Sequence, residues 1–237
     1  MTFLICFDMD RVLVDHMSTW QFVYDKLEIS NEDSFNLYNQ GKLDEWDWLK
    51  LDLALIKNSH PNINDEILRE LCSDTPLMEG IEDCLGWLIE QGHEIAIISG
   101  GMQETARQIA SMYSTGKPYV KRWGGLCSHF EMDTKFHVFT NGWLSNSQGR
   151  LEDYGRYQVQ MNGKGAIVKM LQRRLDISKE KTISIGDSAG DIGMFQESGH
   201  SICFNPWDEK PVAIAKETIR SRNLNDVLES IKNYIRV

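Results

Sequence analysis

The chain has 237 residues, 41% of them hydrophobic, and a formal net charge of −10. That length can bury a large core, and the hydrophobic content is ordinary for a globular protein, which excludes wholesale disorder. The acidic balance argues against a nucleic-acid or anionic-membrane partner, because such binding needs a basic surface that displaces counterions. Any anion that the protein binds must therefore meet positive charge close to its site.

The five cysteines are scattered along the chain and show no spacing typical of a metal site. They predict free, buried thiols in a reducing compartment. The chain starts without a basic segment followed by a long apolar run, and no later stretch is apolar for long enough to cross a bilayer. We therefore expect a cytoplasmic protein that has no membrane partner.

The first predicted strand, residues 3–7, is almost uniformly apolar and has an aromatic residue at each end. This pattern is typical of a central parallel strand that is buried on both faces. Asp8 and Asp10 follow at once, and residues spaced i and i+2 point to the same side of an extended chain. Both carboxylates can therefore face a crevice at the carboxyl end of the strand, where open α/β sheets bind their ligands.

The next segment has helical periodicity and contains no strand-like run. From Trp20 onward, apolar residues recur at i, i+3, i+4 and i+7, and helical spacing continues to about residue 73. We interpret residues 15–76 as a small helical cap domain that is inserted after the first strand. Residues 1–14 and 77–237 then form the core domain.

Predicted strands and helices alternate in the core domain. A second buried strand over 93–98 is followed by Ser99, Gly100 and Gly101, and a later strand over 182–185 is followed by Gly186 and Asp187. Such alternation implies a parallel sheet with helices on both faces. The predicted fold is therefore α/β, a Rossmann-like three-layer sandwich with a central parallel sheet and the helical cap.

Residues 114–160 show a weaker pattern. Strand-like runs at 136–139 and 157–159, together with several turn-like glycine pairs, predict a third core strand and a hairpin in this stretch.

Polar groups of different chemical kinds follow three of the predicted strands, and parallel strands bring such groups to one edge of the sheet. Ser99 offers a hydroxyl, and Gly100 with Gly101 allows close backbone approach with N–H groups at a helix start, which suits a phosphate. Lys164, between two glycines at another predicted helix start, supplies the cation that the acidic chain otherwise lacks.

Four acids are predicted to meet at this edge: Asp8, Asp10, Asp187 and Asp191. Two like charges about 4 Å apart repel by roughly 4 kcal/mol at an effective dielectric constant of about 20, so the acids need a cation. Oxygen ligands without nearby histidine or cysteine favour Mg²⁺, which also binds phosphate oxygens. One carboxylate can then attack phosphorus while a second transfers the proton of the leaving group.

The order and spacing of these residues resemble the four motifs of the haloacid dehalogenase superfamily, in its phosphoserine phosphatase-like branch. The match extends along the whole chain, and the helical insertion is similar to the small cap of that family. The motifs are Asp8-Met9-Asp10-Arg11-Val12, Ile98-Ser99-Gly100-Gly101, Lys164 and Gly186-Asp187-Ser188-Ala189-Gly190-Asp191.

The resemblance implies a phosphatase that acts on a small phosphorylated metabolite. Asp8 would be the nucleophile that forms an aspartyl-phosphate, and Asp10 would be the general acid/base. The second aspartate also argues against dehalogenation, because the carbon–halogen enzymes of the superfamily lack it and need no metal.

The resemblance also implies a ligand for each of the two remaining subsites. Magnesium would be held by the Asp8 carboxylate, the Asp10 backbone carbonyl and Asp187, with Asp191 supporting the ion through water. The phosphate would be held by the Ser99 hydroxyl, the Gly100 amide and Lys164.

Three positions depart from the pattern of the branch. Met17 stands where phosphoserine phosphatases have a glutamate that binds the substrate ammonium, which argues against phosphoserine as the substrate. Gly190 replaces a common asparagine. Arg11 stands where a small residue is usual, and it either pairs with an acid of the cap or contacts the substrate.

Two other functions are compatible with the same residues. A phosphotransferase would pass the phosphoryl group from Asp8 to an alcohol such as homoserine. A non-catalytic signalling module would only carry the phospho-aspartate, although Asp10, Ser99 and the cap argue against that function. The sequence does not determine the oligomeric state or name the substrate.

Overall fold

The computed structural model describes residues 1–113, 118–123, 126–131 and 135–236 of the chain. In this part of the chain a nine-stranded sheet has the order β3-β4-β5-β2-β1-β7-β8-β9, with β6 paired to β5. The pairs β5–β2, β2–β1, β1–β7, β7–β8 and β8–β9 are parallel. The pairs β3–β4, β4–β5 and β5–β6 are antiparallel. The strands are β1 (Leu4–Phe7), β2 (Glu94–Met102), β3 (Pro118–Trp123), β4 (Leu126–Glu131), β5 (Phe136–Ser145), β6 (Leu151–Arg156), β7 (Thr182–Gly186), β8 (His200–Phe204) and β9 (Glu217–Ile219).

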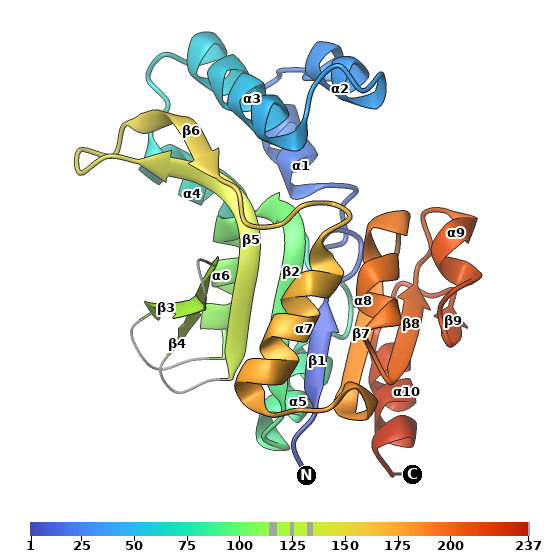
Figure 1. Ribbon diagram of the computed structural model, residues 1–237. Coiled ribbons are helices and arrows are strands. Elements are labelled where there is room, and N and C mark those ends of the chain that lie inside the picture. The colour runs from blue at the N-terminus through green and yellow to red at the C-terminus, as the bar shows by residue number, and fades with distance from the viewer. Residues whose placement is uncertain (114–117, 124–125, 132–134, 237) are drawn as a thin grey trace.

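Helices cover both faces of the sheet and also form a layer beyond one of its edges (Figure 1). Short 3₁₀ turns over Lys179–Lys181 and Ala189–Asp191 flank β7. The α-helices are α1 (Thr19–Lys26), α2 (Glu32–Asn39), α3 (Glu45–Ser59), α4 (Asp65–Ser73), α5 (Ile81–Glu90), α6 (Gln103–Ser111), α7 (Lys164–Leu175), α8 (Ile192–Gln196), α9 (Glu209–Val212) and α10 (Leu224–Arg236).

The first strand divides two separate cores. Ile5 and Phe7 pack in a cluster with apolar side chains of α5, α6 and α10, whereas Leu4 and Cys6 pack in a cluster with α7 and Met194 of α8. Alternate side chains of a strand point to opposite faces, so a strand with helices on both sides must be apolar throughout. This explains the continuous apolar run of β1 and confirms the predicted three-layer α/β sandwich.

The helices α1 to α4 lie beyond the carboxyl ends of the central parallel strands (Figure 1). The chain enters and leaves this layer through two segments that pair with each other. Asp15 N donates to Pro76 O at 2.8 Å, and Met78 N donates to Leu13 O at 2.9 Å. The insertion therefore connects to the sheet at adjacent points.

The hairpin β5–β6 packs against this helical layer. Trp143 and Leu151 share a buried cluster with Leu49 and Leu53 of α3. A Cβ at Gly155 of β6 would overlap the backbone oxygen of Gly142 and crowd the side chains of both leucines, so only glycine allows this close approach. The hairpin thus fastens the helical layer from a third point.

The hairpin also corrects the prediction for residues 157–159, which form no strand. The side chain of Asn141 takes the place of a partner strand there, since its Oδ1 accepts from the backbone N–H groups of Gln158 and Val159 at 2.8 and 3.0 Å. The second strand of the hairpin is β6, which lies earlier in the chain. Within the weakly patterned stretch, residues 114–117, 124–125 and 132–134 lie outside the described residues.

The described part of the chain contains no helix that combines the length and the apolar character needed to cross a membrane. The predicted free thiols are confirmed for Cys6, Cys72, Cys84 and Cys203, each of which is buried and unpaired. The side chain of Cys127 lies outside the described part.

Candidate active site

The sheet brings the predicted groups to one edge. Asp8 directly follows β1 and Asp187 directly follows β7, and these parallel strands are neighbours with Phe7 opposite Ile185. On the other side of β1, Phe7 lies opposite Ile97, so Ser99 of β2 lies level with the start of the loop after β1. The side chains that gather here are buried: Asp8, Ser99, Lys164, Asp187 and Asp191.

Lys164 bridges two of the acids. Its Nζ lies 2.9 Å from Asp8 Oδ1 and 2.7 Å from Asp191 Oδ1, and its side chain is 6% exposed. Burial by itself lowers the pKa of the Lys164 ammonium, but Asp191 and Asp8 more than offset this and raise it above its ordinary value. A buried ammonium is tolerated only with such partners, so α7 delivers a permanent positive charge to Asp8.

Asp191 holds the loop after β7 in place. Its Oδ2 accepts from the backbone N–H groups of Asp187 and Ser188, at 3.0 and 3.1 Å, and from the Ser188 hydroxyl at 3.2 Å. Its other oxygen binds Lys164. The carboxylate therefore fixes both the loop that carries Asp187 and the lysine.

Asp8, Asp187 and Asp191 form a compact group of acids. Each offers a carboxylate oxygen, and these oxygens lie within 4.8 Å of one another. Burial, and next the charge of Asp191, raises the pKa of Asp8. Burial, and next the charge of Asp8, raises the pKa of Asp187 to about 8. The ionised cluster thus carries more negative than positive charge, and a buried set of oxygen donors fits a hard divalent cation.

Asp10 has a different environment from these acids. Its Oδ1 accepts from the backbone N–H of Thr19 at 3.0 Å, and a Cβ at Gly101 would lie 2.9 Å from its Oδ2. Burial, and next the charge of Asp8, raises the pKa of Asp10 to about 7. A carboxyl group that titrates near neutrality can both give and take a proton, as a general acid/base must. Its side chain faces α1 and β2 and does not belong to the grouped acids.

Ser99 and Gly100 reach the same edge, but one detail of the prediction is wrong. Strand β2 continues to Met102 and α6 begins only at Gln103, so the two glycines belong to the strand and not to a helix start. The Ser99 hydroxyl accepts from Gly101 N at 3.1 Å. The strand persists because β2 continues to pair with β5, with a register shift between Ser99 and Met102.

Thr19, which was not among the predicted site residues, joins α1 to two of the motifs. Its backbone N–H binds Asp10, and its Oγ1 accepts from Met102 N at 2.8 Å. Beside it, the Trp20 indole donates to Gly100 O at 3.1 Å. The predicted N-terminus of a helix after the first strand was the available signal, because a helix start exposes unpaired N–H groups.

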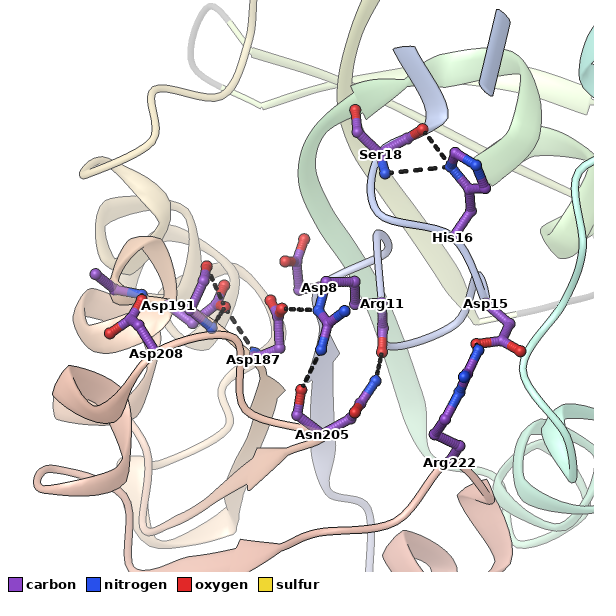
Figure 2. A network of polar contacts seen from close by, with 12 residues as sticks. Asp8, Arg11, Asp15, His16, Ser18, Asp187, Asp191, Asn205, Asp208 and Arg222 are labelled. Carbon is purple, nitrogen blue, oxygen red and sulfur yellow. Dashed lines mark hydrogen bonds and ion pairs between the residues drawn. The ribbon is translucent and has the colours of Figure 1, made fainter. Parts of the chain in front are cut away.

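Arg11 is the second residue whose position only the structure reveals. Its Nε donates to Asp187 Oδ2 at 2.9 Å and its Nη2 donates to the carbonyl of Asn205 at 2.9 Å (Figure 2). Of the two alternatives for Arg11, pairing with an acid of residues 15–76 is therefore wrong, since Arg11 pairs with Asp187. Its guanidinium also lies over the ring of Trp207, 5.1 Å from the ring centre.

Comparisons with known proteins agree with this geometry. A family model described as haloacid dehalogenase-like hydrolase matches residues 4–199. The chain is 24% identical over 237 residues to the phosphoserine phosphatase of Methanocaldococcus jannaschii, with 97% of each chain covered. It is also 24% identical over 191 residues to the phosphoserine phosphatase of Wolinella succinogenes, covering 80% of this chain and 76% of the relative.

A solved structure described as a phospho-aspartyl intermediate analogue of phosphoserine phosphatase has the same fold. Its TM-score is 0.71 at 23% identity, and the alignment covers 97% of this chain and 98% of that chain.

Proposed function

The chain belongs to the haloacid dehalogenase-like hydrolases, as a phosphoserine phosphatase-like hydrolase of phosphoric monoesters, and we propose that it acts on a small phosphorylated metabolite through an aspartyl-phosphate on Asp8, with magnesium as cofactor. The observation that carries the proposal is the pairing of Asp8 with Lys164 in a buried group of acids, with Asp10 nearby on the same loop. A phosphatase of this type needs a nucleophile, an acid/base and a cation at one point.

Asp8 is the nucleophile in this proposal. One carboxylate oxygen of Asp8 forms a bond to phosphorus as the bond from phosphorus to the leaving alcohol oxygen breaks. The Lys164 ammonium, 2.9 Å from Asp8 Oδ1, neutralises negative charge that gathers between the carboxylate and the phosphoryl group. Ser99 and the Gly100 N–H, at the neighbouring strand end, would bind the other phosphoryl oxygens.

Asp10 moves the proton. In the first step its carboxyl group gives a proton to the leaving alcohol oxygen and becomes a carboxylate. In the second step that carboxylate takes a proton from the water that attacks phosphorus, which restores Asp8 and releases phosphate. A pKa raised to about 7 suits both steps, because neither the acid nor the base form is then scarce near neutral pH.

Haloacid dehalogenase-like hydrolases generally use a divalent metal, and magnesium fits the donors of this site. Asp8, Asp187 and the backbone carbonyl of Asp10 would hold it, and Asp191 would support it. A bound magnesium ion would neutralise the carboxylates and polarise the phosphate oxygens. Asp191 has both oxygens engaged, which suits a supporting position.

We propose that residues 15–76 are a cap domain over residues 1–14 and 77–237. Support comes from α1, which binds Asp10 through Thr19 and Gly100 through Trp20. A layer that touches both motifs can exclude water from the phosphoryl group. Trp20 and Trp46 of this segment lie against its buried cluster.

Phosphoserine is the substrate named for the relatives, but Met17 stands in this chain where the motif of the phosphoserine phosphatases has a glutamate. Its side chain is 48% exposed and carries no charge to bind an ammonium group. We therefore propose a phosphomonoester other than phosphoserine. Because the chain is a hydrolase, the non-catalytic signalling function is not favoured, and no contact in the site favours an alcohol acceptor over water.

The test is phosphate release from a panel of small phosphomonoesters, phosphoserine included, with magnesium and with a chelator. We expect magnesium-dependent release that is far faster for one compound than for phosphoserine. Preferred turnover of phosphoserine would contradict the substrate proposal. Equal turnover with magnesium and with the chelator would contradict the proposal that magnesium is the cofactor. Transfer to an added alcohol in place of phosphate release would identify a phosphotransferase.

A further inference from the structure

Arg11 has a backbone conformation that an arginine rarely adopts. Its φ is 62°, in the left-handed region that favours glycine. Asn205, which faces it across the site, is also left-handed with φ of 47°. Outliers of this kind persist only where the surroundings over-determine them, and they often lie at functional sites. The side chain of Arg11 therefore has contacts that offset an unfavourable backbone.

Those contacts tie Arg11 to the acid cluster. The guanidinium binds Asp187 Oδ2 through Nε and the Asn205 carbonyl through Nη2, each at 2.9 Å. Trp207 covers the guanidinium, and its backbone N–H donates to Asp187 O at 2.9 Å. Figure 2 shows Arg11 between Asp187 and Asn205, with its guanidinium directed toward the carboxylate that follows β7.

The cluster therefore has two built-in cations for three acids. Lys164 binds Asp8 and Asp191, and Arg11 binds Asp187. A guanidinium does not lose its proton in a protein, so its charge is present at every working pH. Each acid that could attract a divalent cation already has a cationic partner.

We propose that Arg11 competes with the divalent cation for the Asp187 carboxylate and lowers the affinity of the acid cluster for that cation. This inference rests on the proposed function, because it concerns the same cation site. A bound cation would share the Asp187 carboxylate with Arg11 Nε, and it would place a double positive charge beside a guanidinium. Both effects oppose binding.

A purely positioning role for Arg11 has the opposite consequence. Partners that orient a ligating carboxylate strengthen metal binding, and their removal weakens it. The sign of the change in affinity therefore separates competition from positioning.

The experiment is calorimetric titration of the full-length, chelator-treated protein with Mg²⁺. We compare wild type with Arg11→Asn and Arg11→Gly, because asparagine and glycine both tolerate the left-handed backbone. We expect Mg²⁺ to bind at least about tenfold more tightly to these variants, since a unit charge beside the ion is removed. Arg11→Lys keeps a positive charge beside the cluster and should bind Mg²⁺ less tightly than Arg11→Asn and Arg11→Gly.

A matched control is Arg222→Gln. Arg222 donates through Nε to Asp15 Oδ1 at 3.1 Å, so the variant removes another arginine that binds an aspartate without touching the acid cluster. Its Mg²⁺ affinity should equal that of wild type. Thermal melts of each variant confirm that it is folded.

Equal or weaker Mg²⁺ binding by both Arg11→Asn and Arg11→Gly, with binding by wild type, would overturn the inference and leave the proposed function standing. Binding by the variants alone would support it. Absence of binding in wild type and both variants would overturn the inference together with the cofactor proposal. The Asp187→Asn variant shows whether the measured heat of Mg²⁺ binding comes from this site, because that variant should lose most of the Mg²⁺ binding.

Discussion

Carboxylates are buried in opposite ways in the helical layer and at the carboxyl ends of β1 and β7. In the helical layer, Asp52 of α3 accepts hydrogen bonds from the Tyr24 hydroxyl at 2.6 Å, the Asn31 amide at 2.9 Å and the Ser34 hydroxyl at 2.6 Å. All three donors are neutral. At the carboxyl ends of β1 and β7, in contrast, three acids lie together with Lys164 and Arg11.

The difference shows which buried acids have capacity left for a ligand. A single carboxylate with three neutral donors is satisfied, and its acceptors are occupied. Acids that crowd together repel each other whatever hydrogen bonds they make, so their charge draws a further cation or a reacting group. Burial alone therefore identifies no active site, whereas burial with mutual repulsion does.

The largest expected effect is on turnover, from replacing the same residue type in each region. Asp8→Asn removes the nucleophile and should lower phosphatase activity by at least about a thousandfold. Asp52→Asn should retain activity, because the Ser34 hydroxyl can turn its proton from position 52 to Asn31 O, 2.9 Å away, and then accept from the new amide. Phosphate release by both purified, folded variants checks this. Comparable activity of Asp8→Asn and wild type would refute the assignment of Asp8 as the nucleophile.

The next effect is on the free energy of unfolding, from removing a cation of the acid cluster. Lys164→Met leaves Asp8 and Asp191 without their shared partner, and breaking a buried ion pair costs about 3–5 kcal/mol. Urea unfolding in the presence of a chelator measures the free energy of unfolding. Lys169→Met on the same helix is the control, because Lys169 pairs with Glu197 at the surface and should contribute within about 0.5 kcal/mol. Equal losses in both variants would contradict the structural distinction.

A smaller effect is expected when the Asp52 acceptors are removed altogether. Asp52→Ala leaves the buried Tyr24 hydroxyl and the Asn31 amide without their acceptor, which should cost about 1–3 kcal/mol of unfolding free energy. The same urea experiment applies, with Asp153→Asn as an exposed control. Turnover per folded molecule should match wild type. A large loss of turnover without a loss of stability would instead connect this buried acid to catalysis.

The acid cluster should also make stability depend on pH. The pKa of Asp187 is raised from 3.8 to about 8, first by burial and next by Asp8 and Asp191. A folded-state pKa above the unfolded one means that the native state binds more protons, so this contribution to stability is complete below 3.8 and is lost as the pH rises to about 8.

The measurement for this prediction is the free energy of unfolding with a chelator, as a function of pH, for wild type and Asp187→Asn. Relative to the variant, wild type should lose stability as the pH rises. A wild-type protein that gains stability relative to the variant over that interval would show that Lys164 and Arg11 overcome the repulsion.

Much of the site could be predicted because its signals are local. Asp8, Ser99 and Asp187 each lie at or just beyond the apolar run of a buried strand, and parallel strands must place such residues at one edge. The helix start expected at Gly100 was wrong because pairing with a neighbouring strand, which no local pattern reports, extends β2 to Met102. The predicted strand at 157–159 failed for a similar reason, since a side chain from residue 141 supplies its hydrogen bonds.

The sequence by itself determined the alternation of strands and helices, the inserted helical segment and the chemical kinds of group that follow the strands. Those features depend on spacing within a few residues, where periodicity and turn chemistry act. Only the tertiary structure decided which partner each charged side chain takes. Arg11 meets Asp187 and Asn205, far along the chain, because a long side chain binds whatever the packing of distant strands brings within its reach.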